Sequence, residues 1–319
     1  QLVAGPIERA TNLLPQFYKS HTFNYAQAVD GCRQILWGFF KKMVVADNCA
    51  TAVNLIWGNY TDQSGFTLLM GGFLFTLQIY GDFSGYSDIA IGTARLFGIN
   101  LMRNFSFPYF SRDIAEFWRR WHISLTTWFR DYIYIPLGGS RCARWKVMRN
   151  TLIIFLVSGL WHGANWNFVL WGVYYGVLLM IEKLFLLKWL DKLPNWIGHI
   201  YSMFLVVIGW TIFAQTDIHQ LGEYLKTMFG IGHVAVADSD FLYFLGSNAV
   251  LLVALIAASI DYRVWMRRLK QGKDATVYDA IATSKGWTIA KPVLMVVFLL
   301  VSFAFLVGDS YNPFLYFRF

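Results

Sequence analysis

The sequence predicts an all-α protein that crosses a membrane several times. Of the 319 residues, 56% are hydrophobic and only 14% are charged, whereas about a quarter of the residues in a soluble domain are charged. The apolar residues fall in runs long enough to cross a bilayer. The charges collect between these runs, so the net charge of +8 indicates basic cytoplasmic loops and not a nucleic-acid surface.

Several kinds of site find no support in the sequence. The three cysteines, Cys32, Cys49 and Cys142, are odd in number and far apart, which argues against a disulfide framework or a thiolate metal site. No two histidines have the i, i+4 spacing of a helical zinc site, so no metal is expected. No GxSxG elbow, Walker loop or GxGxxG is present, so hydrolase, NTPase and dinucleotide-binding functions have no motif to support them.

The first part of the chain reads as surface structure followed by a membrane segment. Residues 1–25 contain Gly5-Pro6 and Pro15 and are predicted to form a loop and short helices at the membrane surface. Residues 26–47 show a helical pattern that ends in apolar and then basic residues, which suits an interface. Residues 65–80 are the first clear apolar run. No cleavable signal peptide is visible. Because the sequence starts at Gln1 and not at a Met, we expect further membrane segments before it.

Two carboxylates interrupt the membrane-like stretch at 80–98. Asp82 and Asp88 could orient a catalytic imidazole from within the membrane. Alternatively, they could cap helices or tie them together through Ser84, Tyr86 or Arg95. The structural interpretation is favoured because Asp beside Gly and Ser is common at helix starts.

Residues 105–140 mix aromatic residues with arginines and lack a charge-free span. This pattern predicts one amphipathic or re-entrant helix at the interface, ended by Pro136 and Gly138-Gly139. On such a helix Trp118, His122, Leu125 and Phe129 would share one side. His122 would then be either a polar tip at the headgroups or a second functional histidine.

Five apolar segments follow, at 151–165, 167–187, 197–214, 241–260 and 288–308. Basic loops at 141–149 and 263–273 flank the first four. Four crossings would return both loops to the cytoplasmic side, as the positive-inside rule requires. Segment 151–165 is short for a span. If it is re-entrant, one of the two basic loops is on the other side.

The stretch 158–172, SGLWHGANWNFVLWG, carries one imidazole among apolar residues. His162 could be a buried core histidine with one hydrogen-bond partner, or a general base poised near neutral pH. Its membrane setting favours the second role. Small neighbours, Gly159, Gly163 and Ala164, would let backbone or ligand approach the ring.

Two asparagines follow this histidine closely. Asn165 and Asn167 could donate hydrogen bonds to an oxyanion that develops during acyl transfer. They could equally cap the helical run that begins at Phe168.

Long and specific blocks cover most of the chain. They are LVAGPIERATNLLPQF at 2–17, FKKMVVADN at 40–48, YGDFSGYSDIAIGTARLFGINLMRNFSFPY at 80–109, EFWRRWHISLTTWFRDYIYIPLGGSR at 116–141, GLWHGANWNFVLWGVYYG at 159–176 and NPFLYFRF at 312–319. These blocks resemble the membrane-bound O-acyltransferase superfamily, and within it the bacterial alginate O-acetyltransferase branch. The sequences PLGGSR and WHGANW favour the polysaccharide O-acetyltransferases over the related teichoic acid D-alanyltransferases.

The resemblance implies a fold and a set of site residues. Residues 1–319 would form a single membrane domain, a ring of tilted helices with re-entrant or interfacial helices around a central funnel. His162 matches the family's catalytic histidine, and His122 matches the second histidine of the bacterial branch. Candidate supporting or substrate-binding residues are Trp161, Asp82, Asp88, Asn165 and Asn167. One departure is Ala214, where relatives often carry an arginine.

The resemblance also implies a reaction in the bacterial cytoplasmic membrane. Acetyl would pass from a cytoplasmic thioester, acetyl-CoA or an acyl carrier, to hydroxyls of a cell-surface polysaccharide such as alginate. The transfer would be direct or through an extracytoplasmic partner of the SGNH, serine-hydrolase-like type. No permanently bound cofactor and no nucleic acid are expected. The alternatives are D-alanyl or other acyl transfer of the teichoic-acid type, a non-enzymatic transporter of acyl groups or glycans, and a membrane scaffold.

Overall fold

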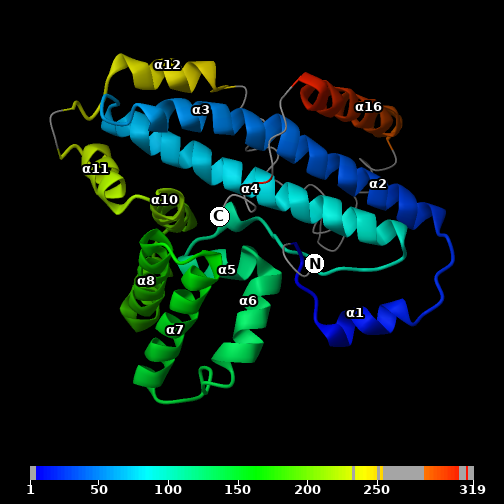
Figure 1. Ribbon diagram of the computed structural model, residues 1–319, viewed down its shortest axis with the longest axis horizontal. Helices are drawn as coiled ribbons and strands as arrows, with labels where there is room; N and C mark the ends of the chain where they lie inside the picture. Colours follow the sequence, from blue (N-terminus) through cyan, green and yellow to red (C-terminus); the bar gives the residue numbers. More distant parts are fainter. Residues whose placement is uncertain (1–4, 232–233, 250–251, 254–283, 309–313, 315–319) are drawn as a thin grey trace. The chain divides into compact units, whose positions relative to one another are not determined.

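A computed structural model describes residues 5–231, 234–249, 252–253, 284–308 and 314. Helices make up all the regular elements of these residues (Figure 1). They are α1 (Ala10–Phe17), α2 (Tyr25–Phe39), η1 (Phe40–Ala46), α3 (Asp47–Gly58), α4 (Gly65–Leu96), η2 (Pro108–Phe110), α5 (Ile114–Arg120), α6 (Ile123–Phe129), η3 (Arg130–Tyr134), α7 (Arg144–His162), α8 (Trp166–Ile181), η4 (Glu182–Leu186), α9 (Leu187–Leu190), α10 (Asn195–Ala214), α11 (Ile218–Met228), α12 (Ser239–Ser247) and α16 (Lys285–Gly308).

Among the helices that the structure describes, four are long and apolar enough to cross a membrane. They are Gly65–Leu96, Trp166–Leu190, Asn195–Ala214 and Gly286–Val307. The prediction of an all-α polytopic membrane protein is therefore confirmed. α7, which contains residues 151–162 of the short segment 151–165, is not one of the four. Residues 250–251 and 254–260 of segment 241–260 lie outside the described residues, as does the basic loop at 263–273, so the predicted sidedness of the loops stays a prediction.

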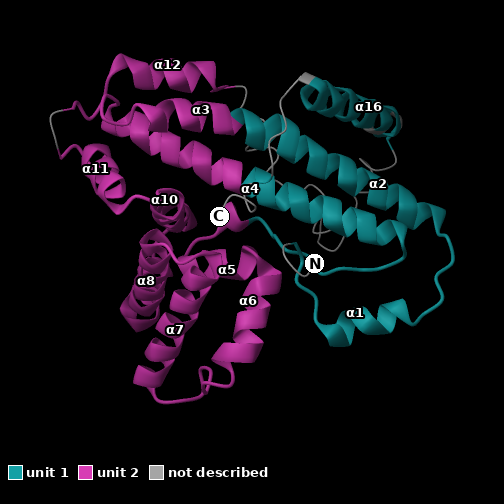
Figure 2. Cartoon of the chain, viewed as in Figure 1, with its two compact units in different colours: residues 1–48, 80–107, 252–318 teal, residues 49–79, 108–251, 319 magenta. Residues whose placement is uncertain are grey.

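The chain divides into two compact units (Figure 2). Unit 1 contains residues 1–48, 80–107 and 252–318, and unit 2 contains residues 49–79, 108–251 and 319. The boundary falls inside α4, which joins the apolar run 65–80 and the polar-interrupted stretch after it into one continuous helix.

In unit 1, glycines allow α2 and the second half of α4 to pack closely in antiparallel fashion. A Cβ added at Gly31 would lie 2.8 Å from the carbonyl oxygen of Gly92, and one added at Gly38 would lie 2.6 Å from that of Gly85. A Cβ added at Gly85 or at Gly92 would lie equally close to a carbonyl oxygen of α2. Small residues of this kind are what brings membrane helices into backbone contact.

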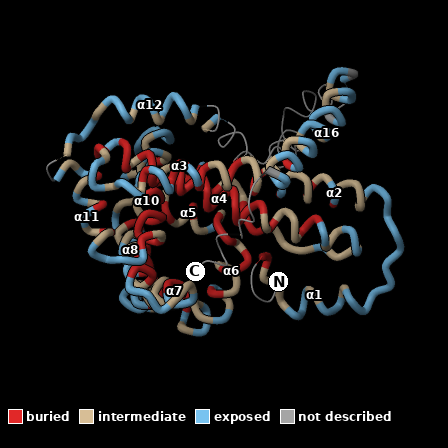
Figure 3. The backbone as a smooth tube through the Cα atoms, turned by 45° about the horizontal axis from the view of Figure 1, so that its top comes forward, coloured by how far each residue is buried: buried red, intermediate tan, exposed pale blue. Residues whose placement is uncertain are grey.

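Unit 2 contains the antiparallel pair α7 and α8, which is also held by glycines. A Cβ added at Gly159 would lie 2.2 Å from the carbonyl oxygen of Phe168, and one added at Gly172 would lie 2.3 Å from that of Phe155. Figure 3 shows buried positions along α4, α8 and α10, whereas α12 and α16 are mostly exposed. The exposed faces of α16 are apolar, as expected of a helix that faces lipid.

Candidate active site

His122 lies at a break between two short helices of unit 2. α5 ends at Arg120 and α6 begins at Ile123, and His122 between them has φ of 42° and ψ of 54°. Its Nδ1 accepts a hydrogen bond from the backbone N–H of Leu125 at 3.2 Å, so the imidazole caps α6. The prediction of one continuous helix through this residue was wrong, because the left-handed backbone turns the chain and ends the helical repeat.

His162 is the last residue of α7 and is half-buried. Its ring meets Trp171 and Phe213 edge to face, with centroids 5.6 and 5.1 Å away, and Phe168 lies at 6.2 Å. Gly163, which follows, has φ of 157°, and a Cβ there would lie 2.7 Å from the Phe168 ring. The small neighbours of His162 therefore admit protein groups, the backbone and ring of Phe168.

The two imidazoles interact electrostatically. Burial, chiefly, and the charge of a protonated His162 together lower the pKa of His122 to about 3, against the opposite effect of a contact with its own backbone. Burial likewise lowers the pKa of His162 to about 4. Both rings are therefore neutral at pH 7, and the mutual repulsion disfavours protonating both at once.

A cluster of aromatic side chains lies on α5, α8 and α10 and at Trp121, and two of its members, Trp171 and Phe213, touch the ring of His162. Its buried members include Phe117, Trp121, Trp171, Tyr175, Trp210 and Phe213. Trp121 and Trp210 lie 4.7 Å apart, and Trp118 meets Trp171 and Tyr175 edge to face at 5.4 and 4.9 Å. Within the described residues, the indole N–H groups of Trp118, Trp171 and Trp210 have no hydrogen-bond partner. Buried donors of this kind are uncommon in native proteins.

The candidate supporting residues near His162 differ in their surroundings. Trp161 is 51% exposed, and the centroid of its ring lies 6.3 Å from that of Trp128 and 6.4 Å from that of Phe129. Asn165 is exposed at the N-cap position of α8, but its side chain makes no capping bond. Asn167 is fully buried, and its Nδ2 donates to the carbonyl oxygen of Phe213 at 2.7 Å. Asn167 thus fixes the backbone of a residue that touches the His162 ring.

Asp82 and Asp88 lie in unit 1, and the histidines lie in unit 2. Asp82 pairs with Lys42 at 2.8 Å, and Asp88 pairs with Lys41 at 2.9 Å. Both lysines belong to the π-helical turn η1 and are buried. The carboxylates tie helices together, as the structural interpretation expects, but through lysines and not through Arg95, which pairs with Asp30.

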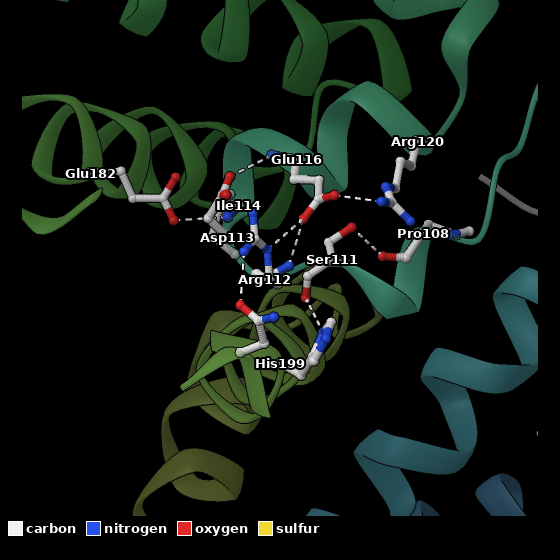
Figure 4. Close-up of polar contacts among 10 residues, drawn as sticks. Pro108, Ser111, Arg112, Asp113, Ile114, Glu116, Arg120, Glu182 and His199 are labelled. Atoms are coloured by element: carbon white, nitrogen blue, oxygen red, sulfur yellow. Dashed lines mark hydrogen bonds and ion pairs between the residues drawn. The ribbon is translucent and has the colours of Figure 1, made fainter. Parts of the chain in front are cut away.

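A polar framework that the sequence did not reveal fixes the start of α5 (Figure 4). The carboxylate of Glu182 accepts hydrogen bonds from the backbone N–H groups of Ile114 and Ala115 at 2.7 and 3.0 Å. Arg112 donates to Asn195, and His199 contacts the carbonyl oxygen of Ser111 at 3.2 Å. An acid inside the apolar segment 167–187 was the available signal, because charged groups in membrane helices are costly and usually functional.

The described residues contain no group of three or more His, Cys, Asp or Glu side chains that could hold a metal ion.

Comparison with known proteins identifies the family. Residues 5–212 match the family model of the membrane-bound O-acyltransferases. The chain belongs to this family. Both histidines, α5 to α8 and most of α10 fall within the matched residues.

Relatives within this family include polysaccharide-modifying enzymes. The chain is 36% identical to the probable alginate O-acetylase AlgI of Pseudomonas putida over 100% of its own length and 66% of that protein. It is 31% identical to the peptidoglycan O-acetyltransferase of Helicobacter pylori, over 100% of the chain and 62% of the relative. The teichoic acid D-alanyltransferase of Bacillus subtilis is 30% identical over 68% of the chain and 59% of the relative. The chain or its matched part thus spans less than two thirds, 59% to 66%, of the length of these relatives.

Proposed function

We propose that this protein is a membrane O-acyltransferase that moves an acetyl group from a thioester donor to hydroxyl groups of a polysaccharide. The observation that carries the proposal is the pair of neutral, electrostatically interacting imidazoles of His122 and His162, the second of which lies against the rings of Trp171 and Phe213. Family membership and the similarity to alginate and peptidoglycan O-acetylating relatives support it.

His162 serves as the general base in this reaction. Its low pKa keeps the ring neutral and able to take the proton of the acceptor hydroxyl. The hydroxyl oxygen attacks the thioester carbonyl carbon and forms the new C–O bond. The C–S bond then breaks, and the imidazolium of His162 returns the proton to the departing thiolate. Atoms and charge balance, and the histidine is regenerated.

His122 serves as a hydrogen-bond donor, a role set by its backbone position. Because Nδ1 accepts the N–H of Leu125, the proton of the neutral ring resides on Nε2. An Nε2–H group can donate to the thioester carbonyl oxygen as negative charge develops on it. The two imidazoles therefore have different tasks: His162 accepts a proton, and His122 stabilises the oxyanion.

The donor, location and partner follow from the proposed reaction. We infer acetyl-CoA or an acyl carrier as the source of the thioester, on the cytoplasmic side of the bacterial inner membrane. The acceptor hydroxyls belong to a polysaccharide on the other side, reached directly or through an SGNH-type partner. A site between two membrane faces lets the acyl group cross while the bulky donor stays in the cytoplasm.

D-alanyl transfer is a second candidate, because the chain is also similar to a teichoic acid D-alanyltransferase. The two activities differ in donor. Full-length protein in membrane vesicles should release free CoA from acetyl-CoA and leave a D-alanyl thioester intact. The reverse preference would favour D-alanyl transfer. Transfer without a membrane gradient separates both activities from a transporter.

Replacement of His162 tests the proposal directly. His162→Ala should lower the O-acetyl content of the acceptor polysaccharide by about 100- to 10,000-fold, the usual contribution of general base catalysis. His219→Ala is the matched control, because His219 is an exposed histidine on α11 and its loss should leave acetylation unchanged. Unchanged acetylation in the His162 variant would refute the proposed function.

A further inference from the structure

Glu182 is a buried carboxylate that the acyl-transfer steps do not use. It is 1% exposed and lies within the candidate membrane span Trp166–Leu190. Its Oε1 accepts from the N–H of Ile114 and from the hydroxyl of Tyr201 at 3.1 Å, and its Oε2 accepts from the N–H of Ala115. Three donors recover part of the cost of burying a carboxylate. That cost raises the question of what the residue provides.

The carboxylate completes the first turn of α5 (Figure 4). The first N–H groups of a helix have no partner inside it. Here Glu182 satisfies those of Ile114 and Ala115, and the side chain of Asp113 satisfies that of Glu116 at 2.6 Å. α5 has only seven residues, too few to be stable alone. Its position therefore depends on these contacts and on the packing of buried Phe117.

The same carboxylate joins the three elements that hold the two histidines. α5 leads directly into Trp121 and His122. Glu182 follows α8, whose Trp171 touches the ring of His162. Tyr201 lies on α10, whose Phe213 also touches that ring. A π-helical turn, Glu182–Leu186, begins at the carboxylate, and such turns occur often at functional sites.

We propose that Glu182 is a positioning residue that sets the place of His122 relative to His162 by anchoring α5 to α8 and α10. This inference rests on the proposed acyl transfer. Glu182 touches neither the donor nor the acceptor. Its effect on the reaction comes entirely from where it holds the Nε2–H group of His122.

Glu182→Gln tests this role, because an amide keeps the shape of the side chain but has one acceptor oxygen in place of two. One N–H of α5 then loses its partner and the helix shifts. Because a misplacement of about 1 Å can cost 100-fold in rate, kcat per folded protein should fall about 10- to 100-fold. KM for acetyl-CoA, the donor used as probe, should stay within about twofold. Glu223→Gln, an exposed acid on α11, is the matched control and should change neither constant.

Tyr201→Phe provides a milder variant should Glu182→Gln fail to fold. It keeps both bonds to α5 and removes only the bond to α10, so kcat should fall about threefold with KM unchanged. The positioning role would be overturned if kcat were unchanged in the variants that fold. It would also be overturned if activity fell only in parallel with the amount of folded protein. Failure of the proposed function is distinguishable, because His162→Ala would then leave acetylation unchanged whatever the Glu182 variants do.

Discussion

At the scale of single residues, the backbone of His122 links folding to chemistry. A left-handed conformation costs a non-glycine residue about 1–2 kcal/mol, and a helix cap returns about 0.5–2 kcal/mol. His122 has both the conformation and the cap. The capping bond also fixes which ring nitrogen carries the proton. One hydrogen bond thus holds the helix start and presents Nε2–H as a donor.

Two substitutions at His122 should separate these contributions. Asparagine tolerates positive φ and is among the best N-cap residues, so His122→Asn should keep the melting temperature in detergent within a few degrees. It should still lose most acyl transfer, because the amide of Asn is shorter than the imidazole and cannot place a donor at the same point. His122→Ala should lose transfer and also the capping contribution, about 0.5–2 kcal/mol of stability. An active His122→Asn enzyme would contradict the donor role.

The lowered pKa values of the two histidines predict a specific pH dependence. In the unfolded chain both titrate near 6.5, whereas in the folded protein they titrate at about 3 and about 4. As pH falls from 6.5 toward 4, the unfolded state binds more protons, so stability decreases by up to about 1.4 kcal/mol per pH unit for each histidine. Above pH 6.5 both histidines are neutral in the folded and the unfolded state, so their titration no longer lowers the free energy of unfolding.

Activity should behave differently from stability over the same range. Because folded His162 stays neutral down to about pH 4, kcat/KM per folded protein should be flat from pH 7 to about 5. Rate measurements and thermal unfolding on the same buffers check this pair of expectations. An acid limb in kcat/KM centred near pH 6.5 would show that His162 is not the buried base described above.

The sequence indicated candidate site residues, whose roles stay a prediction, but it did not indicate their backbone geometry. His122 and His162 stand out because imidazoles are rare in aromatic membrane sequence. The 3.6-residue period, however, placed His122 on a helix face, since nothing in WRRWHISL marks a residue with φ of 42°. Glu182 was overlooked because one acid at the end of an apolar run resembles a loop residue. Its partners, backbone N–H groups, carry no sequence signal.

At the scale of elements, the two close helix pairs depend on glycine at the contact. Asp82 and Asp88 made the second half of α4 look like an interruption of the membrane run, yet α4 continues through both. The lysines of η1 pair with these carboxylates, which lets charged residues occupy a long apolar helix. Local composition could not show this, because the pairing partners lie at least 40 residues apart in sequence.

Gly159→Ala should destabilise the α7–α8 pair. The added Cβ would lie 2.2 Å from the carbonyl oxygen of Phe168, and the contact is backbone, so the helices must separate. Overpacking of this kind costs about 1–3 kcal/mol. Gly222→Ala on α11 is the matched control, since nothing lies within 4 Å of its Cβ, and the helix preference of alanine should stabilise it by up to about 1 kcal/mol. Thermal unfolding in detergent compares the two, and equal shifts would mean that α7 and α8 do not pack as described.

At the scale of the whole molecule, hydrophobic runs located the membrane helices correctly. Segments 167–187, 197–214 and 288–308 correspond to α8 with its extension, α10 and α16. Hydropathy is reliable here because backbone groups in lipid must be satisfied within a helix. Segment 151–165 belongs to α7, whose first turns carry Arg144, Lys146 and Arg149. α7 is therefore not among the four candidate spans.

The structure nevertheless predicts which end of the α7–α8 pair faces the cytoplasm. Arg144 at the start of α7 donates to the carbonyl oxygen of Leu184, and Lys183 donates to Thr151. The basic start of α7 and the basic end of α8 thus lie together, and His162 lies at the opposite end of α7. Because lysine and arginine gather on the cytoplasmic side, both basic ends should be cytoplasmic.

Single cysteines at Lys146 and Lys188, in a background with Cys32, Cys49 and Cys142 replaced by serine, test this orientation. Both should be protected from an impermeant maleimide in intact spheroplasts and labelled in inverted vesicles. Labelling of the two on opposite faces would contradict the antiparallel α7–α8 pair. Labelling of both from outside would reverse its orientation and place the base-bearing end of α7 toward the cytoplasmic donor, so the thioester and not the acceptor hydroxyl would reach His162 by the shorter path.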